Sequence, residues 1–463
     1  GWIDLRTLTG GVTTTADATI NSITVGKGAN SVSENTVVGE NALDASVSGG
    51  ENTAIGFQTL SNNTSGSANT AVGRNSLLAV TTGANNTGVG RGSLASNTTA
   101  SNNTSVGYNS LNSNVGGTQN TASGSNALTT NTSGDANTAF GNQALEANTT
   151  ASFNTAIGSE ALKANTTAGA NTAVGYQSCL NNTTGSNLTA VGQGSLQANT
   201  TGSSLTAIGT GALQVNTTGT NSVAIGNAAL VSNTTGHSNV AVGANALDAN
   251  TTGVQNNAVG YLSLTTNTTG NNNQAFGRKA LELNTTGANN NGVGEKALQN
   301  NTTADNNSAF GHNSLASNTT GTNNSAVGAN SLDANTTADN NTSFGYNSLT
   351  GNTTGSDNVA VGSGALRDNT TASNNVAIGR LSLSANTTGA SNTAVGQGAL
   401  DANTTASQNT AIGRAALGAN TTGSECTAVG YQALASNTTG NANTALGNNA
   451  LGSNTTGTLN TAV

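Results

Sequence analysis

The sequence predicts an all-β fold, a parallel β-solenoid (β-roll) built from stacked 17-residue coils. Three observations predict it. A glycine recurs once in every 17-residue unit, from Gly39 and Gly56 through to Gly447, with no insertion or deletion in between. The composition is strongly biased, because charged residues make up only 6% of the chain and proline and methionine are absent. Finally, no apolar pattern of helical period is present, and Asn-Thr-Thr-Gly stretches form poor helices.

The repeat has the consensus N-T-A-V-G-x-x-A-L-x-x-N-T-T-G-x-x, and we call its invariant glycine the repeat glycine. An array that tolerates no insertion requires each unit to stack on both neighbours, because loops elsewhere accept insertions easily. Stacked units bury a continuous core that no single unit can bury. We therefore expect a rigid rod whose structural glycines include the following: Gly39, Gly56, Gly73, Gly243 and Gly430.

Alternation along a strand places Thr and Val of T-A-V on one face and Ala on the other. We predict that this strand Val and the Leu four residues after the repeat glycine point inward and form the core. The small strand Ala would then face outward, where a second surface can approach closely. On this assignment, Val191→Asp breaks one coil and lowers the melting temperature. Cys179 replaces the Leu once, which suits a small buried hydrophobe.

The two glycines of the repeat carry different constraints. The repeat glycine never varies, which predicts either a positive φ or a position too crowded for a Cβ atom. The second glycine, in N-T-T-G, is replaced by alanine in several repeats, such as Ala100 and Ala151. It therefore needs a small residue and not a left-handed backbone. Asn and Thr are expected to form ladders from coil to coil.

The chain divides into three parts by pattern. Residues 1–25, with the single tryptophan Trp2, are interpreted as an N-terminal strand or linker that leads into the array. Residues 26–38 form a shortened capping repeat, and residues 39–463 are the tandem repeats. The array stops in mid-repeat and the chain lacks an initiator methionine. We expect the natural protein to be longer.

The sequence predicts no catalytic, cofactor-binding or metal-binding residues, and hence no enzyme. His237 and His312 occupy different repeat positions, and the 19 acidic residues form no recurrent pair of the kind that polysaccharide hydrolysis needs. The two cysteines are too many repeats apart for a disulfide in a rod. Eleven Lys and Arg without a cluster predict no nucleic-acid partner, and no apolar run predicts membrane insertion.

The residue directly after the repeat glycine, which we call the post-glycine position, is variable and rich in large side chains. One interpretation is a tolerant outward turn. The other is an aromatic and basic stripe that contacts a surface glycan or polymer, because contact surfaces are enriched in aromatic residues and Arg. The stripe comprises Tyr108, Tyr176, Tyr261, Tyr346, Tyr431, Arg74, Arg91, Arg278, Arg380 and Arg414.

The tandem N-T-A-V-G-x-x-A-L-x-x-N-T-T-G units, and the segment that leads into them (19–39), resemble the repeat arrays of bacteriophage tail-fibre proteins, especially those of marine and cyanobacterial phages. The segments 221–226 and 375–379 are also similar to the head repeats of trimeric autotransporter adhesins, although the usual repeat of that family is shorter. The resemblance implies a left-handed parallel β-roll assembled as a homotrimer. The small strand Ala agrees with close approach of chains.

The resemblance favours a structural fibre shaft, which spaces a host-receptor-binding tip from the virion. Its expected partners are copies of itself, other virion fibre or baseplate proteins, and a host surface glycan. The alternative is a bacterial surface adhesin whose repeats bind host or matrix directly, which places the chain at the cell surface. An ice-binding solenoid is a third class, but the two adjacent threonines of N-T-T point to opposite sides of a strand.

Overall fold

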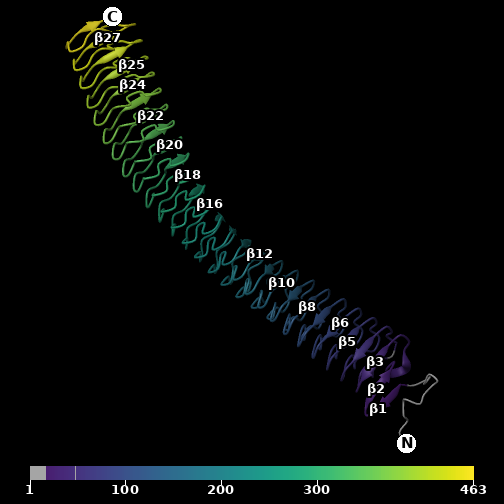
Figure 1. Ribbon diagram of the computed structural model, residues 1–463. Coiled ribbons are helices and arrows are strands. Elements are labelled where there is room, and N and C mark those ends of the chain that lie inside the picture. The colour runs from purple at the N-terminus through teal and green to yellow at the C-terminus, as the bar shows by residue number, and fades with distance from the viewer. Residues whose placement is uncertain (1–16, 47) are drawn as a thin grey trace, which may run out of the picture. The chain divides into compact units, whose positions relative to one another are not determined.

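The computed structural model describes residues 17–46 and 48–463, which form two compact units, Gly1–Thr220 and Asn221–Val463. Trp2 and the rest of residues 1–16 lie outside the described residues. Within each unit the chain winds through short coils that stack one on the next (Figure 1). Each coil contributes one strand, and successive strands of a unit pair in parallel between equivalent repeat positions, as Thr155 with Thr172. These findings confirm the predicted parallel β-solenoid.

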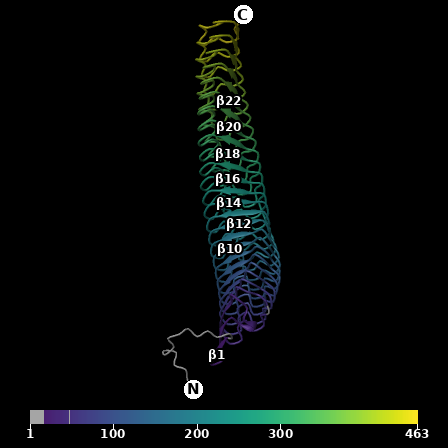
Figure 2. The same cartoon turned by 90° about the vertical axis from the view of Figure 1, so that its right-hand side faces the viewer.

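Nearly all strands contain three or four residues and end at or just before a repeat glycine. The parallel strands of the first unit are β3 (Thr36–Gly39), β4 (Thr53–Ile55), β5 (Thr70–Val72), β6 (Thr87–Val89), β7 (Thr104–Val106), β8 (Thr121–Ser123), β9 (Thr138–Phe140), β10 (Thr155–Ile157), β11 (Thr172–Val174), β12 (Leu188–Val191) and β13 (Leu205–Ile208). Those of the second unit are β14 (Val223–Ile225), β15 (Val240–Val242), β16 (Asn257–Val259), β17 (Gln274–Phe276), β18 (Asn291–Val293), β19 (Ser308–Phe310), β20 (Ser325–Val327), β21 (Thr342–Phe344), β22 (Val359–Val361), β23 (Val376–Ile378), β24 (Thr393–Val395), β25 (Thr410–Ile412), β26 (Thr427–Val429), β27 (Thr444–Leu446) and β28 (Thr461–Ala462). Figure 2 shows β14 to β22 lying in a single column.

An antiparallel hairpin precedes the coils of the first unit. It consists of β1 (Ala18–Ile20) and β2 (Ile23–Gly26), and β2 also pairs antiparallel with β3. A short 3-10 helix, η2 (Ala29–Ser31), joins β2 to β3. The hairpin therefore covers the first parallel strand, whose backbone groups would otherwise be unpaired on that side.

The interior of each coil corrects one of the predictions. The Leu after the repeat glycine is fully buried, as predicted, for example at Leu145 and Leu196. The strand Ala is also fully buried, as at Ala190, whereas the strand Val faces outward, and Val191 is 36% exposed. The prediction that the strand Val forms the core is therefore wrong, and the reason to expect Val191→Asp to break a coil is removed with it. The strand Ala offers no outer surface to a second chain.

The space inside the coil explains why Ala and not Val points inward. Where a glycine replaces the strand Ala, at Gly88, an added Cβ would lie 2.6 Å from Oγ of Ser76 and 3.2 Å from Cγ of Leu77. The space beside the buried Leu is therefore narrow, and a side chain larger than Ser occupies the strand Ala position only at Val37, which is buried in the first parallel strand, β3. Since close-packed interiors do not accept overpacking without strain, the larger β-branched side chain takes the solvent side of the strand in the coils that follow β3.

The turns of each coil depend on left-handed residues, most of which are not glycine. The buried Leu itself has a positive φ, 52° at Leu145 and 50° at Leu196. A non-glycine residue in this region is disfavoured by roughly 1–2 kcal/mol. Two contributions offset that cost: full burial of the Leu side chain, and a hydrogen bond from the Leu196 amide to the carbonyl of Ala212 in the next coil, at 3.0 Å.

The repeat glycines combine both properties that could make a glycine obligatory. All five of the representative repeat glycines have φ between 120° and 157°. At Gly243 an added Cβ would lie 2.6 Å from the carbonyl oxygen of Gly260, the repeat glycine of the next coil. The second glycine differs, because at Gly185 and its equivalents φ is not positive, and Ala168 occupies the same place in the preceding coil.

Two buried columns of asparagine run through the stacked coils. In the column from N-T-T-G, the Asn148 amide donates to Oδ1 of Asn131 at 2.9 Å and to the Ala151 carbonyl at 3.1 Å. In the strand column, Oδ1 of Asn120 accepts the backbone N–H of Asn137 at 2.9 Å. The predicted ladders are confirmed, and these fully buried amides make up much of the core. Buried amides are stable only when they are hydrogen-bonded.

Removing one ladder amide should destabilise the stack. We expect Asn148→Ala to lower the free energy of unfolding by about 1–3 kcal/mol, because it removes two donated hydrogen bonds and one of the two acceptors of Asn165 Nδ2, which lies 3.2 Å away. Chemical denaturation measures the effect. Thr150→Ala is the control, since the exposed Thr150 lies two residues away, and it should change stability by less than about 0.5 kcal/mol. Equal effects of the two variants would contradict the ladder's role.

Candidate functional site

The outward face of the strands, formed by the strand Thr and strand Val side chains, is the first candidate surface, and we call it the outer β face. The strand Val positions carry half-exposed apolar side chains in coil after coil, such as Ile157 at 41% and Phe140 at 60% exposed. Parallel register places equivalent residues side by side, as Val174 beside Val191. An apolar column therefore follows the coils of each unit, interrupted in the first unit by Ser123 of β8.

The outer β face carries no charge. In residues 39–463, every charged residue falls at other positions of the repeat, mostly in the turns, and none replaces a strand Thr or strand Val. The strand Thr column is unbroken from Thr36 to Thr206 in the first unit, whereas Val, Asn, Gln and Ser replace several of its members in the second. The face is thus neutral, regular and partly apolar. Sequence reasoning missed it because it placed the Val column inside.

The post-glycine stripe is the second candidate surface. The structure places all ten of its predicted residues in exposed positions on the turn after the repeat glycine: Tyr108, Tyr176, Tyr261, Tyr346, Tyr431, Arg74, Arg91, Arg278, Arg380 and Arg414. It does not bring them all together, since small or polar residues separate Tyr176, Tyr346 and Arg380 from the others. Large residues are consecutive only in some coils.

Three arginines of the stripe lie over aromatic rings of adjacent coils. The guanidinium carbons of Arg74, Arg91 and Arg414 lie 5.6, 5.7 and 5.8 Å from the ring centroids of their neighbours, which are Phe57, Tyr108 and Tyr431 respectively. These are cation–π distances.

Arg278 is different, because it forms an ion pair with Glu295 of the next coil. Its hydrogen bond is the main reason that the pKa of Glu295 lies below its ordinary value. The charge of Arg278 is therefore already compensated within the chain.

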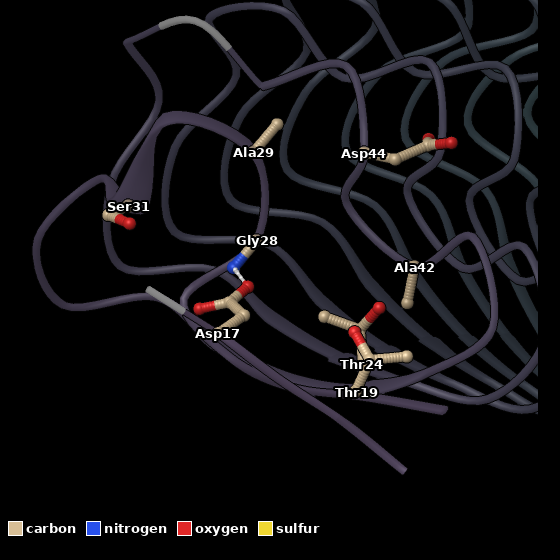
Figure 3. Close-up of a pocket in the computed structure, with 8 residues that line it drawn as sticks. All are labelled: Asp17, Thr19, Thr24, Gly28, Ala29, Ser31, Ala42 and Asp44. Carbon is tan, nitrogen blue, oxygen red and sulfur yellow. Dashed lines mark hydrogen bonds between the residues drawn. The ribbon is translucent and has the colours of Figure 1, made fainter. Parts of the chain in front are cut away.

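A hollow of about 340 Å³ lies at the N-terminal hairpin, and Asp17 and Asp44 are among its lining residues (Figure 3). The Asp17 carboxylate accepts the backbone N–H of Lys27 at 2.7 Å and that of Gly28 at 2.6 Å. Figure 3 shows the Asp44 carboxylate directed away from Asp17. The two carboxylates are not directed at each other, and Asp17 fixes the turn after β2.

A second hollow, of about 300 Å³, is lined by glutamines of adjacent coils in the first unit. The Gln197 amide donates to Oε1 of Gln177 at 2.9 Å, and the Gln177 amide donates to Oε2 of Glu160 at 2.8 Å. The bonds from Gln177 and then from Lys163 lower the pKa of Glu160. These polar groups therefore satisfy one another's hydrogen bonds from coil to coil.

The side chains that most often act as nucleophiles or metal ligands are few. Burial raises the pKa of the Cys179 thiol to about 12 and also raises that of Cys426, so neither is a thiolate at neutral pH. In residues 17–46 and 48–463, no three His, Cys, Asp or Glu residues are placed to hold a metal ion. None of the described segments is a helix with the length and apolar character to cross a bilayer.

Stacked coils of one short repeat, a neutral outer β face and a stripe of large turn residues define a tandem-repeat β-solenoid protein. Comparison of the chain with models of protein families, and with curated proteins, finds no match.

Proposed function

We propose that this chain is the structural shaft of a virion tail fibre, a homotrimer that spaces a host-receptor-binding tip from the particle. The observation that carries the proposal is the outer β face: a regular, charge-free column of half-exposed Val, Ile and Phe side chains in coil after coil. The resemblance of the repeats to phage tail-fibre arrays supports a location in the virion.

The size of the apolar column favours a covered face. Monomeric proteins rarely expose contiguous apolar patches larger than a few hundred Å². The second unit alone has 15 strands, β14 to β28, that each add to the outer β face. Half-exposed aliphatic side chains on that many coils, with the strand Thr column beside them, amount to an area of the order of the ~800 Å² that each partner buries in a specific interface.

Copies of this chain are the best-matched occupants of the face. Each copy presents the same side chains once per coil, so copies that lie side by side stay in register along a whole unit. No charge on the face opposes the approach of an identical surface, and like charges across an interface would cost several kcal/mol. A stacked, hydrogen-bonded coil also gives the stiffness that a spacer needs.

The oligomeric mass tests the proposal. Light scattering of the purified chain should give three times the chain mass of 44.9 kDa. Val174→Asp combined with Val191→Asp should yield monomers with unchanged circular dichroism, because two charges then lie in the apolar column. The matched control combines Ser186→Asp with Ser203→Asp, at a turn position where Asp occurs naturally, and should remain trimeric. A monomeric wild-type chain, or a trimeric Val variant, would refute the assembly.

The exposed post-glycine stripe favours a second candidate, a bacterial surface adhesin whose repeats bind directly. Aromatic and Arg side chains at the surface are typical of contact regions. The sequence of the full gene discriminates the two, since a C-terminal membrane anchor supports the adhesin and a tip or chaperone domain supports the fibre.

The strand Thr column favours a third candidate, an ice-binding surface, in the first unit. The threonines from Thr36 to Thr206 point outward from adjacent strands, unlike the adjacent threonines of N-T-T. This use requires the outer β face to be free. A monomer that inhibits ice recrystallisation would support it and would exclude the trimer.

A further inference from the structure

Four consecutive coils of the first unit carry large side chains at the post-glycine position. In order they are Phe57, Arg74, Arg91 and Tyr108, and all four are exposed. We call this set the Arg row. It lies on the turn after the repeat glycine and does not belong to the outer β face.

The charge of the Arg row is not compensated by the chain. Arg74 and Arg91 are the only charged residues between positions 52 and 134, in a protein whose net charge is −8. Within the described part of the chain, neither arginine has an ion-pair partner. Arg278 and Arg367, by contrast, pair with Glu295 and Asp368.

Arg74 and Arg91 occupy the same repeat position in adjacent coils. Arg74 lies over Phe57 of the preceding coil and Arg91 over Tyr108 of the following coil, so the two guanidinium groups are directed away from each other. Most coils have a small or neutral residue at this position, so the repeat does not require an arginine there. The repeat itself therefore does not explain why arginines without an acidic partner occur in two consecutive coils.

Each of the two guanidinium groups contacts the aromatic residue at its own end of the Arg row. Arg74 lies over the ring of Phe57 at 5.6 Å and Arg91 over that of Tyr108 at 5.7 Å. A cation–π contact leaves the N–H donors at the edge of the guanidinium unused, and these donors form a fork that matches a carboxylate or sulfate group. Each arginine is thus positioned while its hydrogen-bonding edge stays available.

We propose that the Arg row binds an acidic polysaccharide, a linear glycan that carries carboxylate or sulfate groups. The row presents one side chain per coil along the direction of stacking, which suits an extended polymer better than a compact ligand. The arginines bind the anionic groups, and the flanking rings pack against the apolar C–H faces of the sugar rings. The inference does not rest on trimer formation, because the residues of the row lie on the turn and none of them is a strand Thr or strand Val.

Charge density favours a glycan over a nucleic acid as the polyanion. Double-stranded DNA carries one charge per ~1.7 Å, and proteins that bind nucleic acids without specificity present a continuous basic groove. Two arginines over four coils of an acidic protein provide far less. An acidic glycan, in which charged and neutral sugars can alternate, fits this spacing.

Binding of the full chain to immobilised alginate and to chondroitin sulfate tests the inference, with dextran as the neutral probe and a single-stranded DNA oligonucleotide as the competing polyanion. Wild-type protein should bind at least one of the two acidic glycans, and neither dextran nor DNA. Arg74→Gln combined with Arg91→Gln should weaken glycan binding by at least about tenfold, because both charge-assisted forks are lost.

Two control variants separate this site from general electrostatics. Arg278→Gln removes a positive charge that Glu295 already neutralises, so glycan affinity should not change. Arg74→Lys combined with Arg91→Lys keeps the charge and loses the fork, and it should bind more weakly than wild type but more tightly than the Gln variant. Failure to bind either acidic glycan, equal binding of DNA, or unchanged affinity in the Gln variant would each overturn the inference.

Discussion

Replacing Leu196 by aspartate should unfold the coils around it. The Leu196 side chain is fully buried, and the substitution places a carboxylate among apolar and amide groups that are already paired. Burying an unpaired charge, together with the lost packing of the Leu, should cost about 4 kcal/mol or more. Because each coil of a solenoid contacts only its neighbours, the damage should be local. Hydrogen exchange would show lost protection in the adjacent coils, and thermal denaturation would show a lowered transition.

Val191→Asp is the matched comparison, since it introduces the same charge in the same coil, directly before the repeat glycine Gly192. Val191 is 36% exposed on the outer β face, and its carboxylate would remain in contact with water. We expect hydrogen exchange in its coil to remain close to wild type, with a stability change of about 1 kcal/mol or less. Loss of protection equal to that of the Leu196 variant would show that the strand Val does contribute to the interior.

Replacing the repeat glycine Gly192 by alanine should be nearly as damaging. Its φ is 131°, and an added Cβ would lie 2.6 Å from the carbonyl oxygen of Gly209 and 2.7 Å from its carbonyl carbon. Both atoms belong to the backbone of the next coil and cannot move without breaking the register of the stack. We expect destabilisation by about 3 kcal/mol or more, measured by chemical denaturation.

Gly194→Ala separates crowding from backbone conformation. Gly194 also has a positive φ, 63°, but the nearest atom to an added Cβ is 3.6 Å away. Gln58 and Lys279 occupy the same position in other coils with a similar φ. A cost of about 1 kcal/mol is expected. If Gly192→Ala were no worse than this control, the close approach of neighbouring coils would not be what requires the repeat glycine.

The two faces of the strand show where prediction from sequence fails. Alternation in T-A-V identifies which side chains share a face, but it does not say which face is inside. Hydrophobicity favours Val191 as the core residue and Ala190 as the surface residue, and the structure has them the other way. The space across the coil decides, because Leu196 and its equivalents fill most of it, and Val takes the inner position only at Val37, in the first parallel strand.

The post-glycine stripe also has features that the sequence predicts and features that only the structure shows. The sequence alone identified the post-glycine stripe, because its residues recur at one position of the repeat. Which members act together depends on contacts between adjacent coils, such as Arg74 with Phe57 and Arg278 with Glu295. The register places such residues in neighbouring coils, but the ion pair and the cation–π contacts themselves are seen only in the structure.

The sequence by itself determined the coil length, the parallel register, the obligatory repeat glycine, the buried Leu and the asparagine ladders. Each of these follows from strict periodicity, since identical units can stack over a whole array only if every unit makes the same contacts. The tertiary structure decided which strand face meets water, that asparagine is a core residue, and which turn residues compensate one another. Those depend on the space inside a coil and on neighbours from adjacent coils, and both exist only once the chain is wound.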